Sequence, residues 1–290
     1  MSSTSVVRRE SRERRFRLAL SPGDILKQLA LWLICVIALT PLYFLVVTSL
    51  KSKTDYLLST WGPPLHPTFE NFMTALADGR LLAWTWNSVV VTVLSVAACT
   101  MISALAAYAF AQMAFPGRDV LLNIFIAMIV IPPVIMIIPL FILMVNVNLV
   151  NTYWSAIIIY TGLMIPFSIY LLTNFFRTVP REILDSGQID GCSRLRIFTA
   201  LILPLSMPAL VTLVIVNALF VWNELLIALT FLQDDSVRTL MAGLTEFKGR
   251  FFLNQPLIMT GALIATIPMV IVYVAGQRFF VRGLVAGAVK

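Results

Sequence analysis

Four acidic residues stand where this 290-residue sequence could use their charge: Glu182, Asp185 and Asp190 in one polar segment, and Glu224 alone within an apolar one. Carboxylates form strong hydrogen bonds with the basic groups of a partner. An acid inside an apolar membrane segment usually faces a cavity or another polar group. The Gly-x-x-x-x-Gly-Lys-Ser/Thr pattern that holds nucleotide phosphates is absent from the sequence. Energy from nucleotide hydrolysis could therefore reach these residues only from another protein.

The polar segment Arg177–Phe198 predicts two short helices joined by a sharp turn. Pro180 can open the first helix, because its missing N–H would be unpaired there anyway, and Glu182 then lies at the positive end of the helix dipole. Gly191 can close this helix in the left-handed conformation, and Ser193 can cap the next one. A short amphipathic helix of this kind can lie in a groove of a partner protein or rest on lipid at the membrane surface.

The elements that position these residues are predicted to lie in a membrane. Val120–Phe176 is a run of 57 residues without a charged side chain, and a hydrocarbon core about 30 Å thick needs about 20 apolar residues per helical crossing. The run therefore predicts two crossings joined by a turn, which Asn146, Asn148 and Asn151 mark. Only 12% of all residues are charged, against roughly 25% in soluble domains, which excludes a separate soluble catalytic domain.

Six apolar segments are long enough to cross a bilayer. They are Leu29–Leu50, Trp86–Phe110, Val120–Val145, Thr152–Phe176, Leu203–Phe231 and Leu257–Gln277. Prolines recur within them, and kinked helices are tolerated where neighbouring helices satisfy the released carbonyls. The predicted fold is an all-α membrane protein of six transmembrane helices with a cytoplasmic loop, residues 177–202, between the fourth and the fifth. A basic N-terminal tail (1–28), the six-span domain (29–281) and a C-terminal tail (282–290) follow one another.

Charge sets the predicted orientation. With the N-terminus in the cytoplasm, fifteen of the 21 Lys and Arg residues lie on the inner side and six on the outer side. This asymmetry favours both termini inside, on the cytoplasmic side of the membrane. The net charge of +7 is therefore interpreted as an orientation signal beside anionic lipid, and we expect no nucleic acid partner.

The sequence gives little evidence of a catalytic or metal-binding site. Cys35, Cys99 and Cys192 are far apart and have no metal-like spacing, and His66 is the only histidine. An intramembrane serine protease would need a nucleophile with a positioned base, whereas the histidine lies in a predicted outer loop. An ion-coupled carrier would bury several titratable groups in repeated halves, whereas the predicted spans contain one serious candidate, Glu224. We therefore expect no enzyme activity, and no metal or cofactor bound by this chain.

Glu224 and its polar neighbours Asn217 and Asn223 leave two interpretations open. An acid at the bilayer centre costs about 2.5–3.5 kcal/mol on insertion scales, so such a residue usually has a specific role. These three residues could line or gate a translocation path. They could equally form hydrogen bonds between helices near the membrane surface.

The polar segment resembles the cytoplasmic coupling loop, called the EAA loop, of bacterial ABC importer permeases. The matching residues are Pro180, Glu182, Asp185, Ile189-Asp190-Gly191 and Leu203-Pro204. The sequence departs from the family at Asp185-Ser186-Gly187, where Glu-Ala-Ala is usual, and Gly187 costs about 1 kcal/mol relative to Ala in a helix. We therefore expect a looser helix until a partner holds it. The resemblance implies that a partner ATPase contacts Glu182, Asp185, Ser186, Gly187, Asp190 and Gly191.

Other segments resemble the second permease of maltose-type carbohydrate importers. They are Pro41-Leu42, Thr48–Lys51, Pro67–Phe72, Trp222-Asn223-Glu224 and the tail Arg278–Lys290. The resemblance implies a heterodimer with a second permease subunit, two ATP-binding subunits that use ATP and Mg, and an extracytoplasmic solute-binding protein. It further implies that Gln233–Pro256 reaches the solute-binding protein, and within it we expect contacts from Thr245, Glu246, Phe247, Lys248 and Gly249. A permease for amino acids or peptides is the alternative.

Overall fold

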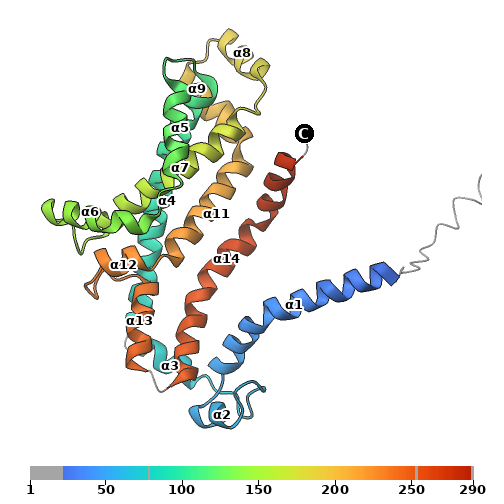
Figure 1. Cartoon of the computed structure of the whole chain (residues 1–290), viewed down its shortest axis with the longest axis vertical. Coiled ribbons are helices and arrows are strands. Elements are labelled where there is room, and N and C mark those ends of the chain that lie inside the picture. The colour runs from blue at the N-terminus through green and yellow to red at the C-terminus, as the bar shows by residue number, and fades with distance from the viewer. Residues whose placement is uncertain (1–21, 78, 252–253, 289–290) are drawn as a thin grey trace, which may run out of the picture.

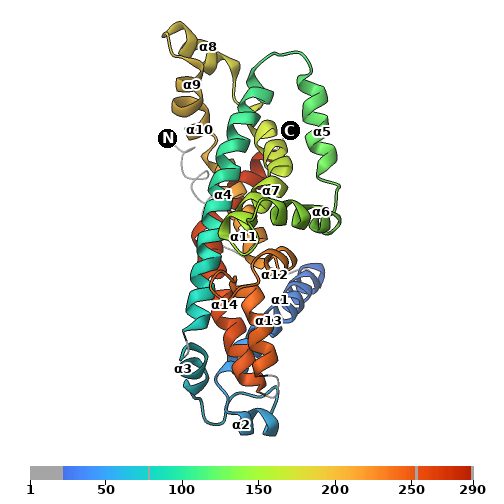
Figure 2. The same ribbon diagram turned by 90° about the vertical axis from the view of Figure 1, so that its left-hand side faces the viewer.

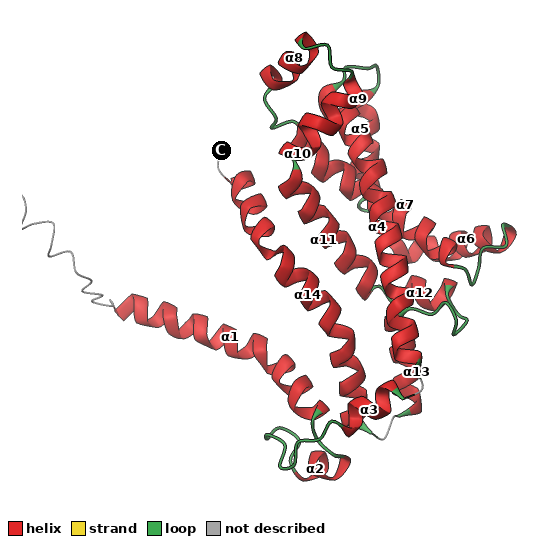
Figure 3. Ribbon diagram, turned by 180° about the vertical axis from the view of Figure 1, so that it is seen from behind, coloured by secondary structure: helices red, strands yellow, loops and turns green. Residues whose placement is uncertain are grey.

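The described part of the chain consists of helices and connecting loops, as predicted, and contains no strand (Figure 3). The computed structural model describes residues 22–77, 79–251 and 254–288, so most of the predicted basic tail (1–28) lies outside the described residues. The helices are α1 (Pro22–Ser49), α2 (Lys53–Leu58), α3 (Glu70–Leu76), α4 (Arg80–Gln112), α5 (Arg118–Met128), α6 (Pro133–Asn146), α7 (Tyr153–Phe176), α8 (Arg181–Ile189), α9 (Arg194–Ile197), the π-helix η1 (Phe198–Ile202), α10 (Leu203–Leu205), α11 (Met207–Asn223), α12 (Leu226–Phe231), α13 (Leu240–Arg250) and α14 (Gln255–Ala288).

The two ends of the bundle carry different loops (Figures 1 and 2). α8 and α9 lie at one end, whereas α2 and α3 lie at the other, next to the start of α14. The sequence predicts that the first end is cytoplasmic and that the second lies outside. The structure separates the two sets of loops accordingly, and which end faces the cytoplasm stays a prediction.

Four helices are long and apolar enough to cross a membrane: α1, α4, α7 and the part of α14 up to Gln277. Two bent pairs also meet the criteria of length and composition. α5 and α6 meet at 98°, and the segment Arg194–Leu205 meets α11 at 77°. The described residues therefore hold four continuous spans, or up to six if each bent pair counts as one.

Prolines break the third predicted span, Val120–Val145. α5 ends at Met128 and α6 begins at Pro133, directly after Pro132, whose backbone is extended (φ −64°, ψ 130°). A proline lacks the N–H that a continuing helix needs, and it disfavours the helical conformation of the residue before it. α6 therefore turns away from α5 and lies at the side of the bundle, crosswise to its long axis (Figures 1 and 2).

The fifth predicted span, Leu203–Phe231, is interrupted twice, and the prediction of one helix over these residues is wrong. Ser206 (φ −97°, ψ 9°) separates α10 from α11. Pro208 lies in the first turn of α11, where a proline leaves no helical hydrogen bond unmade. At the other end of α11, Glu224 has an extended backbone (φ −73°, ψ 130°), and the chain resumes as α12.

The predicted asparagine turn is confirmed. α6 ends at Asn146, and both Asn148 (φ 56°) and Asn151 (φ 60°) adopt the left-handed conformation that asparagine tolerates. The Asn151 backbone N–H donates to the carbonyl of Phe231 over 2.9 Å, and its side-chain oxygen accepts from the Gln233 N–H over 2.7 Å. The turn thereby ties the start of α7 to the end of α12.

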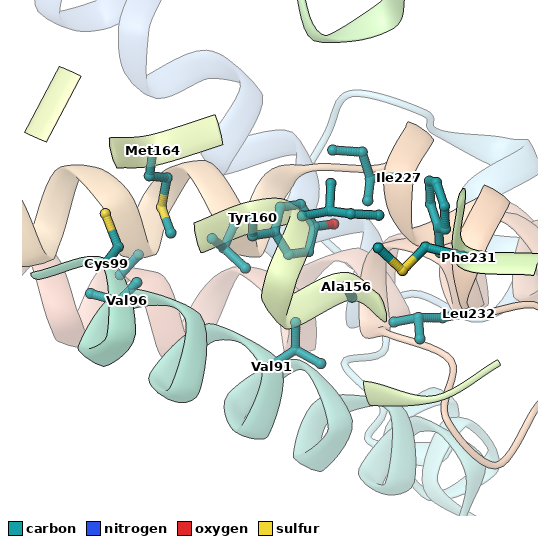
Figure 4. Packing of buried hydrophobic residues seen from close by; sticks show 13 residues of the cluster. Val91, Val96, Cys99, Ala156, Tyr160, Met164, Ile227, Phe231 and Leu232 are labelled. Carbon is teal, nitrogen blue, oxygen red and sulfur yellow. The ribbon is translucent and has the colours of Figure 1, made fainter. Parts of the chain in front are cut away.

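α4 and α7 form the centre of the bundle, and Tyr160 on α7 lies within an apolar cluster to which both helices contribute (Figure 4). Its side chain is fully buried. Side chains from α4, α7 and α12, with one from the loop after α12, surround it: Val91, Val96, Cys99, Ala156, Met164, Ile227, Phe231 and Leu232. This cluster fixes α12 against the two central helices.

α1 projects away from the other spans (Figures 1 and 3) and packs against α14 near its own C-terminal end. Just beyond α1, Lys51 is fully buried. Its ammonium group donates to the carbonyl oxygens of Ser59 over 2.5 Å and Thr60 over 3.2 Å. The Asn71 amide donates to the carbonyls of Ser49 and Lys51 over 2.9 and 2.8 Å, so this end of the bundle is held by specific polar contacts.

Gly243→Ala is expected to destabilise the packing of α13 on α4. A Cβ atom at Gly243 would overlap Cε3 of Trp84, which is buried. Overpacking of this kind costs about 1–3 kcal/mol, so the thermal unfolding midpoint of the purified protein in detergent should fall. The matched control is Gly249→Ala in the same helix, where a Cβ meets nothing within 4 Å. Equal midpoints for the two variants would contradict the packing described.

Candidate functional site

α8 presents one polar face away from the bundle. Glu182, Asp185, Ser186 and Ile189 are exposed, as is Asp190 at the end of the helix. The first four follow the i, i+3, i+4, i+7 spacing that places side chains on one side of a helix. Ile189 is 86% exposed, so the face combines carboxylates with an apolar side chain. A groove with basic groups around an apolar floor would complement it.

Gly191 closes α8 and turns the chain into α9, as predicted. Its φ of +73° lies in the left-handed region, which residues with a Cβ atom rarely adopt. The Cys192 N–H donates to the carbonyl of Gly187 over 3.0 Å, which satisfies an acceptor at the helix end. The predicted cap is also confirmed, because the Ser193 hydroxyl accepts from the Arg196 N–H over 3.3 Å.

Gly187 lies where α8 packs against the segment that follows it. The residue is buried, and an added Cβ would lie 3.1 Å from Cδ1 of Leu201 and 3.4 Å from Cγ1 of Ile197. The glycine lowers helix propensity, but it permits a close contact between two helices. Packing thus offsets the looseness that the sequence predicts for α8.

Apolar contacts and hydrogen bonds connect the α8–α9 segment to the central spans. Leu184 is buried in a cluster that includes Phe176 at the end of α7. The Tyr108 hydroxyl on α4 donates to the carbonyl of Arg194 over 3.3 Å, and the Gln112 amide joins α4 to α7 by donating to the carbonyl of Phe176 over 2.7 Å. A displacement of α8 would therefore be passed to α4 and α7.

Glu224 accepts three hydrogen bonds at the break between α11 and α12. Its Oε1 accepts from the Leu226 N–H over 2.8 Å, and its Oε2 accepts from the Ile227 N–H and the Tyr160 hydroxyl, each over 2.9 Å. Two of these donors are N–H groups in the first turn of α12, where a negative charge is favoured by the helix dipole. Glu224 thus caps α12 and links it to α7.

Asn217 and Asn223 form hydrogen bonds with residues other than Glu224 and its partners. Asn217 is buried, and its amide donates to the Ser168 hydroxyl on α7 over 3.0 Å and contacts the Cys99 sulfur on α4 at 3.7 Å. The exposed Asn223 amide donates to the carbonyl of Leu219 in its own helix. The structure therefore does not gather the three predicted path residues into one site; two of them join helices.

The five residues predicted to contact a solute-binding protein lie on α13, and they differ in exposure. Thr245, Lys248 and Gly249 are exposed, whereas Phe247 is buried against the bundle. Glu246 is half-buried and forms ion pairs. The first three are available to a partner, and the last two hold α13 in place.

An ionic cluster that the sequence did not predict anchors α13. Glu246 pairs with Arg80 over 3.2 Å and also with Arg238, which lies 3.3 Å from Asp235. Asp235 in turn pairs with Arg80 over 3.5 Å and accepts from the indole N–H of Trp84 over 2.9 Å. These residues come from the loop between α12 and α13, from the first two turns of α4 and from α13 itself, and no periodic pattern marks them. Their only sequence signal is a concentration of charges near the ends of spans.

A cavity of about 760 Å³ lies between α4, α11 and α14. Its lining is aliphatic and aromatic apart from Thr92 and Thr100, and none of the predicted path residues belongs to it. A hydroxyl-rich solute loses its hydrogen bonds to water in such a cavity. The lining contributed by this chain alone therefore does not suit a sugar.

Comparison with known proteins identifies the family. Residues 99–285 match the family described as binding-protein-dependent transport system inner membrane component. The chain is 35% identical over 251 residues to the melibiose/raffinose/stachyose import permease protein MelC of Bacillus subtilis, covering 86% of this chain and 91% of the relative. It is 34% identical over 270 residues to the sulfoquinovosyl glycerol transport system permease protein SmoH of Agrobacterium fabrum, covering 92% and 94%.

A solved structure shows the same fold. It is the crystal structure of a bacterial ABC transporter involved in the import of the acidic polysaccharide alginate. One of its chains matches with a TM-score of 0.76 and 23% sequence identity, covering 90% of this chain and 98% of that chain. With its long apolar helices, this protein is an integral membrane protein and a transport component rather than a catalytic subunit. The chain belongs to the family of binding-protein-dependent transport system inner membrane components.

Proposed function

We propose that this chain is the membrane-spanning permease subunit of an ATP-driven, binding-protein-dependent importer for a sugar or a related polyol. The observation that carries the proposal is similarity over most of the chain to permeases named for melibiose, raffinose and stachyose and for sulfoquinovosyl glycerol. The neighbour in fold belongs to an alginate importer. These names favour a carbohydrate over an amino acid or a peptide as the solute.

The partners follow from this assignment. A second permease subunit completes the path, two ATP-binding subunits use ATP and Mg on the cytoplasmic side, and a solute-binding protein delivers the sugar outside. The exposed acidic face of α8 supports a contact with an ATP-binding subunit at one end of the bundle. The exposed residues of α13 support a contact with the solute-binding protein toward the other end.

Transport in this proposal is a movement of packed helices. Closure of the ATP-binding subunits shifts α8, and the contacts of Leu184 and Tyr108 pass the shift to α7 and α4, which the Gln112 hydrogen bond joins to each other. The 77° bend beside Ser206 is a place where the α8–α10 segment can change its angle to α11. Such switching needs two packings of similar free energy, and interrupted spans support it.

Glu224 has a gate role in this proposal through the position of α12. Its hydrogen bonds to α12 and to Tyr160 tie that short helix to α7. A change in the packing of α7 would therefore move α12. Asn217 and Asn223 lie on the preceding helix, and Asn217 connects it to α4 and α7.

The function is tested by purifying the chain with its co-expressed subunits and reconstituting the complex in vesicles. ATP inside the vesicles and the solute-binding protein outside should drive uptake of one labelled saccharide against its gradient. The isolated chain in matched vesicles should show no uphill uptake. Uphill transport by the chain alone, or ATP-driven uptake of amino acids but of none of the saccharides, would contradict the proposal.

Gly191→Val should uncouple ATP hydrolysis from uptake. A left-handed backbone costs a residue with a Cβ atom about 1–2 kcal/mol, and Gly191 has a φ of +73° at the turn after α8. The turn should rearrange and move the acidic face, so ATPase activity should no longer respond to the loaded solute-binding protein. Gly79→Val is the matched control, because Gly79 has a φ of +71° and opens α4 far from α8. Normal uptake by the Gly191 variant would contradict the coupling role.

Lys248→Glu should weaken the response to the solute-binding protein. Lys248 is exposed on α13, and loss of one surface ion pair is worth up to about 1 kcal/mol. The concentration of solute-binding protein at half-maximal uptake should therefore rise by about two- to fivefold, with the maximal rate unchanged. Lys53→Glu makes the same charge change at an exposed position on α2 and is the control. Equal effects of the two variants would reject a specific contact at α13.

A further inference from the structure

A second cavity lies between α5 and α7, and it is polar. Its volume is about 220 Å³. The residues that line it come from α5 and from the half of α7 that leads to α8, with its C-cap Arg177: Asp119, Leu122, Asn123, Ile126, Tyr170, Thr173, Asn174 and Arg177. The proposed transport path and the contacts of α8 use none of these side chains.

Most of the polar groups in this cavity lack a partner within the described part of the chain. Thr173 is 1% exposed, and its hydroxyl oxygen is buried without a hydrogen bond. The side chains of Asn123, Tyr170, Asn174 and Arg177 likewise form no hydrogen bond or ion pair with the described residues. Five neighbouring side chains thus offer donors and acceptors that the fold itself does not use.

Polar side chains without partners are unusual at this position, beside two membrane segments. α7 is a membrane span, and α5 is the first half of a bent one. A polar group that loses its hydrogen bonds to water in an apolar setting costs about 1–3 kcal/mol in proteins, so polar side chains in membrane segments normally pair with one another. The cavity is open at its side, since Tyr170 is 43% exposed. A polar ligand can therefore enter from the lipid.

We propose that this cavity binds the headgroup of a phospholipid, preferably phosphatidylethanolamine, from the leaflet on the α8 side. The Arg177 guanidinium would hold the phosphate, because its fork of N–H groups matches phosphate oxygens. The amides of Asn123 and Asn174 and the Thr173 hydroxyl complete the donors. Asp119 would accept from the ammonium group, since only its Oδ1 is bonded, to Arg118 Nε over 3.1 Å.

The first test measures lipid that stays on the protein. The intact transporter is purified in mild detergent, and bound phospholipid is identified by native mass spectrometry. Arg177→Gln should reduce retained phosphatidylethanolamine by about tenfold, because a hydrogen-bonded charge pair is lost. Arg196→Gln removes the same charge from an exposed position on α9 and should leave retention unchanged. Equal retention in the Arg177 variant and the wild type would overturn the proposal.

The second test measures the thermal stability of the Thr173→Val variant, for which two explanations of the buried hydroxyl predict changes of opposite sign. If the buried hydroxyl only lacks a partner, replacing it with a methyl group of the same shape should stabilise the protein in every lipid. If the hydroxyl binds the headgroup, the variant should lose part of the gain in melting temperature that phosphatidylethanolamine gives the wild type. A gain equal to that of the wild type would overturn the assignment of Thr173.

The third test separates the source and the type of the ligand. Thermal stability of the wild type is compared in vesicles of phosphatidylethanolamine with phosphatidylglycerol, in vesicles of phosphatidylcholine with phosphatidylglycerol, and in the second mixture with inorganic phosphate. Stabilisation in the first mixture alone, abolished by Asp119→Asn together with Arg177→Gln, supports the proposal. Equal stability in the first two mixtures overturns the role of the ammonium group. Stabilisation by inorganic phosphate alone would overturn lipid as the occupant. Cross-linking of a second subunit to residue 174 would overturn it as well.

Discussion

Each interruption of a helix within a membrane releases backbone groups that must find new partners, because the lipid offers none. Glu224 supplies a carboxylate to the first N–H groups of α12. Asn151 bonds to the end of α12 through both its backbone and its side chain. Pro133 stands at the start of α6, where a missing N–H costs nothing. The broken spans of this protein depend on these local solutions.

The same constraint explains why polar side chains within the spans join helices. Asn217 reaches Ser168 on α7, and Tyr160 reaches Glu224. Asn87 on α4 donates to the carbonyls of Ser236 and Arg238. A polar residue in an apolar segment therefore has two possible uses, a solute path or a link between helices. In these cases the observed geometry is a link.

The two ends of the bundle are built differently, and both are fastened to α4. At one end, apolar packing under α8 leaves its acidic face exposed. Toward the other end, α13 is held by ion pairs between Glu246 and the arginines at positions 80 and 238, and by burial of Phe247. This arrangement suits the proposed importer, because partners at opposite faces can influence each other only through a connected set of helices. In the proposed importer, the bends at residues 129–132 and 206 are the places where that set would change its shape.

The sequence by itself determined the features that depend on a short stretch of chain. Apolar length predicted the helical spans, the asparagines predicted the turn before α7, and Gly191 and Ser193 predicted the turn after α8, because each follows from hydropathy or from local backbone preference. The tertiary structure alone decided how sharply the spans bend, which polar groups pair, and which residues of α13 are exposed. The pair of Arg80 and Glu246 joins residues far apart in the chain, and neither periodicity nor spacing records such a contact. The packing of whole helices determines which residues of this kind pair, and the sequence of one segment by itself does not contain that information.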